Sequence, residues 1–204
     1  MKKLLAFTIL ALTLQSCKNK RESSVVNHIN ESVADSLHWK KMKCGLYINQ
    51  NGEMGIKDFR AVGKDHDIEE YYLTEFADSL RTPFNKIIDT ATFKELGNTF
   101  YQDKNHIYRF YGMAKGGSFY FFDEADYKTF HILGDFYAKD KNHIYEMRKG
   151  KLDSVDYKTF KTCNGCGPYS KDKNGYYRWG DKVDLKNIDD GIEAQMQVYK
   201  IEKL

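Results

Sequence analysis

The sequence predicts a mainly β protein in which repeated β-hairpins, each followed by a short capped turn, stack as a small repeat array with minor helix. Two observations lead to this prediction. The hexapeptide DKNHIY occurs at Asp103–Tyr108 and at Asp140–Tyr145, and a related copy, DKNGYY, occurs at Asp172–Tyr177. The chain also contains 15 Tyr, 13 Phe and 15 Gly but only 2 Pro, and this composition favours strands and tight turns.

The first sixteen residues resemble a secretory signal peptide. Lys2 and Lys3 precede the apolar stretch Leu4–Leu14, which is well below the ~20 apolar residues that a spanning helix needs. The stretch ends in LQSC, which resembles the lipobox of bacterial lipoproteins. This resemblance implies cleavage before Cys17 and its acylation, with palmitate-type chains holding the protein at a membrane. The alternative is an ordinary cleaved signal with an incidental cysteine.

Residues 17–43 are expected to form a tether, and residues 44–204 a single domain able to bury its own core. The formal net charge is +3, but the excess of basic residues lies in the signal and the tether; from Cys44 onward acidic residues slightly outnumber basic ones. A phosphate-binding surface needs a basic domain or stripe, so nucleic acid is not an expected partner. Because Lys18, and no retention aspartate, follows Cys17, the expected location in a Gram-negative cell is the outer membrane.

Two segments come before the clear repeats. Asn51-Gly52 is a strong hairpin signal and predicts a degenerate leading unit at Cys44–Arg60. The next segment, residues 61–86, lies outside the repeat motif. Within it, Asp67–Leu80 has apolar residues near helical spacing, which predicts a helix.

A second element, D-x-x-T-F, comes before each hexapeptide. It begins at Asp89, Asp126 and Asp156, and a worn copy, DLKNI, begins at Asp184. Each of these aspartates is expected to cap the backbone of a single turn, which is a commoner role for a repeated aspartate than catalysis. The phenylalanine of each element is expected to fill the space between neighbouring hairpins.

The D-K-N tripeptides are expected to be the hairpin turns, because Asn tolerates the left-handed conformation that tight turns require. The predicted turn residues are Asp103, Asn105, Asp140, Asn142, Asp172 and Asn174. Alternation places the tyrosine and the large apolar residue of each returning strand on one face. That face is expected to form an aromatic stripe, either as core or as a binding surface. Its candidate binding residues are Tyr108, Tyr145, Tyr177 and Trp179.

The two elements in fixed order, D-x-x-T-F and then Y-x-K-D-K-N-x-I-Y, resemble the repeat of the DKNYY family of exported bacterial proteins. The resemblance covers about residues 88–189. Gln102 departs from the pattern, since one residue fewer separates Tyr101 from Asp103 in that unit. The resemblance implies no substrate, cofactor or catalytic residue.

The motif CNGC at Cys163–Cys166 could be a redox pair, half of a zinc site or a structural disulfide. Its Gly-rich flank lacks a strand–CxxC–helix context, and no second CxxC supplies zinc ligands. Without Cys17, three thiols remain, which predicts one disulfide and one free cysteine. A bond from Cys44 to Cys163 or Cys166 is favoured over the local pair, since a longer loop gains more from closure.

Other candidate sites have plainer interpretations. His106 and His143 occupy equivalent turn positions, but the third copy has Gly175 there, so we interpret them as surface residues and expect no metal. The frame of a calcium loop is incomplete. The Gly-rich Lys115–Ser118 is interpreted as a loop insertion that extends the second unit.

We therefore expect a lipid-anchored envelope protein with a non-catalytic binding or structural role and no cofactor. Its expected partners are the membrane, through the N-terminal lipid, and a protein or polysaccharide bound by the aromatic surface. One alternative is an immunity-like inhibitor of a secreted toxin. Another is a thiol redox or metal-binding protein that uses Cys163 and Cys166.

Overall fold

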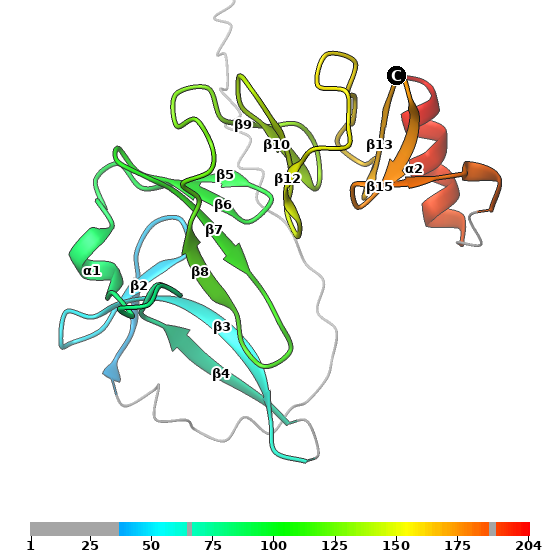
Figure 1. Ribbon diagram of the computed structural model, residues 1–204. Helices are drawn as coiled ribbons and strands as arrows, with labels where there is room; N and C mark the ends of the chain where they lie inside the picture. The colour runs from blue at the N-terminus through cyan, green and yellow to red at the C-terminus, as the bar shows by residue number, and fades with distance from the viewer. Residues whose placement is uncertain (1–36, 65–66, 188–190) are drawn as a thin grey trace, which may run out of the picture.

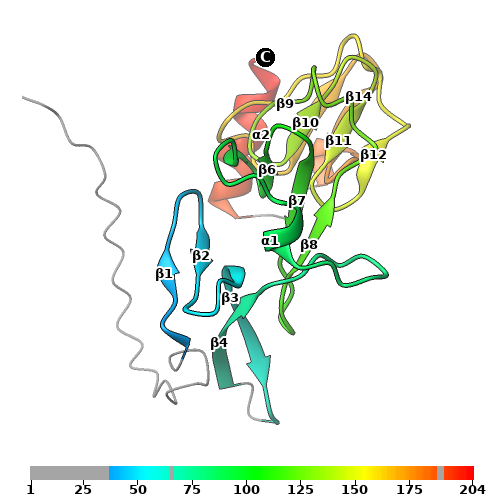
Figure 2. The same ribbon diagram turned by 90° about the vertical axis from the view of Figure 1, so that its left-hand side faces the viewer.

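The computed structural model describes residues 37–64, 67–187 and 191–204 (Figures 1 and 2). The signal peptide, Cys17 and most of the predicted tether lie outside the described residues. In the described part, four antiparallel sheets follow one another along the chain, and helices are few. The prediction of a mainly β fold with minor helix is confirmed.

The first sheet is a four-stranded meander in the order β1-β2-β3-β4. Its strands are β1 (Lys40–Lys41), β2 (Leu46–Ile48), β3 (Met54–Val62) and β4 (Asp67–Leu73). Alternation along β2 and β3 turns Leu46, Met54 and Ile56 toward the first core cluster, so the sheet has one buried face and one outer face. A short helix, α1 (Phe84–Ile87), follows this sheet.

The helix predicted over Asp67–Leu80 is wrong, because Asp67–Leu73 is strand β4. It pairs with β3 in a continuous register from Val62 opposite Asp67 to Ile56 opposite Leu73. Tyrosine and isoleucine have high strand propensity, and a long neighbouring strand supplies the cross-strand contacts that a helix would forgo. Tertiary pairing therefore overrides a weak helical periodicity.

The second and third sheets repeat the meander. The second has the order β5-β6-β7-β8 and the third the order β9-β10-β11-β12. The strands of the second sheet are β5 (Lys94–Gly97), β6 (Phe100–Gln102), β7 (Ile107–Tyr111) and β8 (Ser118–Phe121). Those of the third are β9 (His131–Ile132), β10 (Tyr137–Lys139), β11 (Ile144–Glu146) and β12 (Gly150–Leu152). The first two predicted D-K-N hairpins are thus each the centre of a four-stranded unit.

The last unit has three strands and ends in helices. Its strands are β13 (Tyr169–Asp172), β14 (Gly175–Arg178) and β15 (Asp181–Val183), and they are followed by the 3-10 helix η2 (Leu185–Asn187) and by α2 (Ile192–Glu202). Ile201 of α2 is buried against Cys166 and Tyr169, so the helix covers the last hairpin. The first sheet and α2 lie at opposite ends of the array (Figures 1 and 2).

The three central hairpins share one register. The tyrosine of the returning strand lies opposite Tyr101 in the first unit, Ala138 in the second and Ser170 in the third. This register corrects one point of the sequence comparison. Phe100, and not Tyr101, takes the place of Tyr137, so Gln102 is the counterpart of Lys139 and the first unit lacks no residue.

The core is a series of four clusters along the array rather than one central mass. The D-x-x-T-F phenylalanines connect successive units within these clusters. The ring of Phe130 lies 5.1 Å from that of Phe100 in the preceding unit, and the ring of Phe160 lies 5.4 Å from that of Tyr137. These side chains therefore fill the space between neighbouring hairpins.

Candidate functional site

The first hairpin turn is organised around the carboxylate of Asp103, which is buried. Its Oδ1 accepts hydrogen bonds from the backbone N–H groups of Asn105 and His106, at 2.8 and 2.9 Å. Its Oδ2 accepts from the Asp89 N–H at 2.9 Å and from the Tyr108 hydroxyl at 2.7 Å. The turn, the preceding capped turn and the returning strand thus meet at one side chain.

The second turn repeats these contacts around Asp140. Its carboxylate accepts from the N–H groups of Asn142, His143 and Asp126, each at 2.7 Å, and from the Tyr145 hydroxyl at 2.8 Å. Burial alone would raise the pKa of Asp140. The hydrogen bonds outweigh burial and lower this pKa to about 2.

Asp172 holds the third turn with fewer donors. It accepts from the N–H groups of Asn174 and Asp156, at 2.7 and 2.5 Å, and from the Tyr177 hydroxyl at 3.0 Å. Gly175 takes the histidine position of this turn. All six predicted turn residues therefore lie in the three hairpin turns.

The threonine of each D-x-x-T element forms hydrogen bonds that connect the element to the hairpin turn. In the first unit, the Thr92 N–H and hydroxyl both donate to Asp89 Oδ1 at 2.9 Å, and Thr92 Oγ1 accepts from the Lys104 N–H at 2.9 Å. The Lys104 ammonium lies 2.7 Å from Asp89 Oδ2. The second and third units make the same contacts through Asp126, Thr129 and Lys141 and through Asp156, Thr159 and Lys173.

Successive units are joined by a tyrosine that sequence reasoning did not single out. The Tyr127 hydroxyl donates to the backbone carbonyl of Asp103 at 2.6 Å, and the Tyr157 hydroxyl donates to that of Asp140 at 2.7 Å. Both follow the aspartate of D-Y-K-T-F. In the worn fourth copy Leu185 takes this position and lacks a hydroxyl, and the array ends there.

The predicted leading unit has a turn of the same kind. Asn49 is buried, and its Oδ1 accepts from the N–H groups of Asn51 and Glu53, each at 3.0 Å. Asn49 therefore takes the place of Asp103. In the strand register Gly55 lies opposite Tyr47, as Tyr108 lies opposite Tyr101, so a glycine stands where the other units have tyrosine. With no tyrosine hydroxyl to accept from, this turn needs no carboxylate.

The structure corrects the interpretation of the tyrosine stripe as a binding surface. Tyr108 and Tyr145 are fully buried and Tyr177 is 2% exposed. Burial and the hydrogen bond to Asp103 raise the pKa of Tyr108 far above its usual range. Burial and the bond to Asp140 do the same for Tyr145. These hydroxyls are internal donors.

Trp179 is the one predicted binding aromatic that is partly exposed. Its ring lies 4.6 Å from that of Phe136, and the guanidinium of Arg148 lies 3.9 Å from its centroid. It borders a groove of about 460 Å³ between β14 and α2, together with Pro168, Gly191, Glu193 and Gln197.

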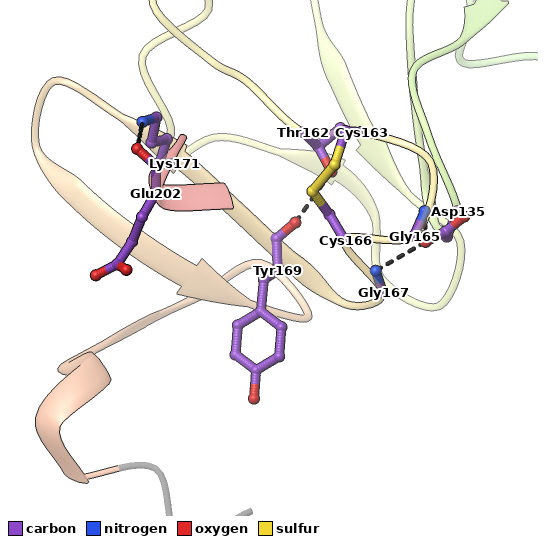
Figure 3. The surroundings of a disulfide bond; sticks show 9 residues. All are labelled: Asp135, Thr162, Cys163, Gly165, Cys166, Gly167, Tyr169, Lys171 and Glu202. Carbon is purple, nitrogen blue, oxygen red and sulfur yellow. Dashed lines mark hydrogen bonds between the residues drawn. A yellow bond between two sulfur atoms is a disulfide. The ribbon is translucent and has the colours of Figure 1, made fainter. Parts of the chain in front are cut away.

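The disulfide joins Cys163 to Cys166, with Cα atoms 5.2 Å apart, and Cys44 is free (Figure 3). The favoured pairing with Cys44 is therefore wrong. Cys44 packs in the cluster of the first sheet, whereas Cys163 and Cys166 pack under α2 at the other end of the array. A disulfide needs Cα atoms within about 7 Å, so Cys44 cannot bond to either cysteine, although the longer loop would gain more entropy from closure.

The CNGC loop is held by Asp135 of the preceding unit. The N–H groups of Gly165 and Gly167 both donate to Asp135 Oδ2 at 2.7 Å (Figure 3). The predicted loop insertion, Lys115–Ser118, is also bound by a neighbour. Its Gly117 N–H donates to Asp58 Oδ2 of β3 at 2.6 Å, which ties the second sheet to the first.

His106 and His143, the two histidines of the repeat turns, have different neighbours. His106 lies beside the ring of Phe121, and His143 Nδ1 lies 3.5 Å from the Tyr145 hydroxyl. Among residues 37–64, 67–187 and 191–204, no group of three His, Cys, Asp or Glu side chains is placed to hold a metal ion.

An aromatic surface that sequence reasoning missed lies on the outer face of the first sheet. We use the term outer face for Trp39, Tyr47, Phe59, Ile68 and Tyr72. The rings of Trp39 and Tyr72 are stacked at 4.2 Å, and Tyr47 meets Tyr72 edge-on at 5.2 Å. Phe59 and Ile68 are 53% and 55% exposed. A strand pattern over residues 54–73 would have predicted this face.

Residues 114–181 match the DKNYY family, so the match covers the second and third hairpins. No curated protein and no solved structure matches the chain. Within the part of the chain that the structure describes, no helix is long and apolar enough to cross a membrane.

Proposed function

Because residues 114–181 carry the DKNYY family pattern, we propose that this chain is a non-catalytic binding protein of the bacterial cell envelope. In this proposal, residues 1–16 direct export, and lipid on Cys17 holds the chain at a membrane. That membrane is the outer membrane if the cell is Gram-negative. The repeat units form a stiff support, and the partner binds outside them.

The observation that supports this role most strongly is the internal use of the motif's polar groups. The carboxylates of Asp103 and Asp140 each accept four hydrogen bonds from their own unit. A general base or nucleophile needs a lone pair directed at a substrate. Carboxylates surrounded by internal donors are instead suited to fixing a turn.

The first sheet, which flanks the repeat units, carries exposed apolar side chains on its outer face. Phe59 and Ile68 project from it, while the tyrosines of the units are buried. Exposed apolar patches on soluble domains often mark interaction sites. The outer face is therefore the proposed binding surface, and its proposed partner is a protein or a polysaccharide.

The anchoring part of the proposal is tested by metabolic labelling with an alkyne fatty acid. The protein should become labelled, and its mass should correspond to a chain that begins at Cys17 and carries acyl groups. Cys17→Ala should abolish both the label and the cleavage. A labelled Cys17→Ala chain, or an unlabelled native chain, would contradict lipidation.

The binding part is tested in intact cells with a photo-cross-linking residue placed at Phe59. A matched control places it at Asn142, an exposed residue of a repeat turn. Adducts are expected from position 59 and not from position 142. Adducts from neither position, or from position 142 alone, would contradict binding through the flanking sheet.

Thiol exchange at the disulfide remains the second candidate, because Cys163 and Cys166 are bonded within one loop and Cys163 is only partly buried. Equilibration in glutathione buffers decides this point. A redox role requires a reduction potential between about −270 and −120 mV, whereas a structural disulfide lies below about −300 mV.

A further inference from the structure

Trp39 forms a flat platform on the outer face. Its indole is nearly parallel to the ring of Tyr72, with an interplanar angle of 10° and a centroid distance of 4.2 Å. One face of the indole is therefore covered by Tyr72, and the residue remains partly exposed. Tyr47 supports Tyr72 from the side, at an interplanar angle of 67°.

Gly55 of β3 makes room for this indole. A Cβ atom at position 55 would lie 3.1 Å from Cη2 and Cζ3 of Trp39 and 3.2 Å from Cβ of Tyr72. These distances are tighter than ordinary packing. A glycine inside a strand often marks such a close approach, and any larger residue here would lift the indole from the sheet.

An ion pair lies in the middle of the same face. Lys57 Nζ and Glu70 Oε2 are 2.6 Å apart, and both side chains are partly exposed. In the strand register, Lys57 is opposite Tyr72, and Glu70 is opposite Phe59. The pair therefore lies between the Trp39–Tyr72 stack and the exposed ring of Phe59.

We propose that the outer face binds a polysaccharide, with Trp39 stacking on one sugar ring and Phe59 contacting another along the chain. A pyranose ring has an apolar face of C–H groups and a rim of hydroxyls. The rings stack on the C–H face, and the Lys57 ammonium and Glu70 carboxylate form hydrogen bonds with the hydroxyls. This inference rests on the proposed binding function and names its ligand.

The dimensions of the face agree with a chain of several sugar units. Gly55, which contacts the indole, and Phe59 are four residues apart on β3 and therefore face the same side of the sheet. Their Cα atoms are about 13 Å apart. A protein partner is less suited to this face, because the centre of a protein interface is depleted of charged residues. Here the charged pair is central and the rings flank it.

Affinity electrophoresis of the purified full-length protein, in mild detergent, tests the proposal. The native gels contain one soluble polysaccharide each: mixed-linkage glucan, xylan, galactomannan, glycol chitosan or dextran. At least one of these should retard the protein. Trp39→Ala and Phe59→Ala should each weaken the apparent affinity, the first by about tenfold or more.

Two further variants separate stacking from folding. Gly55→Ala keeps the indole but displaces it, and should reduce retardation while the unfolding midpoint changes less than for a core substitution. Trp179→Ala removes the other tryptophan, at the opposite end of the array, and should leave retardation unchanged. In a Trp179→Phe background, sugar binding should change the fluorescence of Trp39 directly.

The outcomes also separate this inference from the proposed function. Retardation that survives Trp39→Ala would overturn the stacking site while leaving polysaccharide binding in place. No retardation by any of the five polymers would overturn the ligand class, and the cross-linking at Phe59 would still decide the binding role. Retardation with shortening of the polymer would overturn the non-catalytic function but keep the platform.

Discussion

The carboxylate of Asp103 lies where donors from three segments converge, and this convergence explains why the motif pairs Asp with Tyr five residues later. Its Oδ1 accepts from the turn, and its Oδ2 accepts from Asp89 and Tyr108. A buried carboxylate needs several donors to remain charged. Tyrosine supplies one of these donors together with a large ring for the core.

Replacing Tyr108 by Phe tests this pairing. The ring would remain against Phe76 and Phe119, but the donor to Asp103 at 2.7 Å would be lost. We expect the free energy of unfolding to fall by about 1–3 kcal/mol, the usual cost of removing a hydrogen bond to a buried charged group. Chemical denaturation measures the change. Tyr199→Phe, at a largely exposed position of α2, is the control and should have little effect; equal losses would contradict the pairing.

Acid should destabilise the protein through the same carboxylates. The pKa of Asp140 is about 2 in the folded chain and about 3.9 in an unfolded one. A depressed folded pKa contributes stability above the unfolded value, and this contribution disappears as the pH falls from about 4 through about 2. Asp140→Asn should therefore lower stability at pH 7 and reduce the further loss between pH 4 and pH 2. An unchanged slope of stability against pH would refute this assignment.

Hairpins with a strong local signal could be predicted from the sequence, and elements fixed by distant contacts could not. The D-K-N turns combine a turn tripeptide with flanking aromatics, so the hairpins followed directly. The apolar residues of β4 recur at a spacing close to that of a helix, and only the pairing of β4 with β3 decides its conformation. Helix α2 was not predicted, because its apolar residues lie on both sides of the helix and give no single apolar stripe. Ile201 is buried and Val198 half-buried, whereas Ile192 and Met196 are exposed.

The candidate site was missed for a related reason. The sequence drew attention to the tyrosines, and only the stacking of units shows that neighbouring sheets bury them. Trp39 lay within the predicted tether, although it packs against Tyr72 of β4. Such a contact between residues more than thirty positions apart leaves no local pattern. Gly55 leaves room for the indole, and nothing in the sequence around Gly55 indicated this role.

Helix α2 offers a matched pair of substitutions. Ile201 is fully buried against the last hairpin, and Ile192 on the same helix is 78% exposed. Ile201→Ala should lower the free energy of unfolding by about 2–5 kcal/mol, because it removes core contacts and leaves a cavity. Ile192→Ala should change it by less than about 0.5 kcal/mol. Similar values from thermal or chemical unfolding would show that α2 does not cover the third unit.

The array has a nearly one-dimensional arrangement of cores. Each cluster packs mainly with residues of its own sheet and of an adjoining one, and the first sheet and α2 lie at opposite ends (Figure 1). Stability in such a chain is close to a sum over units and their contacts with neighbours. The disulfide at Cys163 and Cys166 closes a loop inside the last unit, so it strengthens one end and does not connect the two.

This arrangement predicts that the two ends unfold separately when one is weakened. The chain has two tryptophans, Trp39 beside the first sheet and Trp179 at the end of β14, so each end carries its own fluorescent probe. In single-tryptophan variants made with Trp39→Phe or Trp179→Phe, adding Ile201→Ala should lower the urea midpoint reported by Trp179. It should leave the midpoint reported by Trp39 nearly unchanged, because no contact of Ile201 reaches the first core cluster. Equal shifts of both midpoints would mean that the units unfold as one cooperative body. The hydroxyl links of Tyr127 and Tyr157 to the preceding units would then transmit stability along the full array.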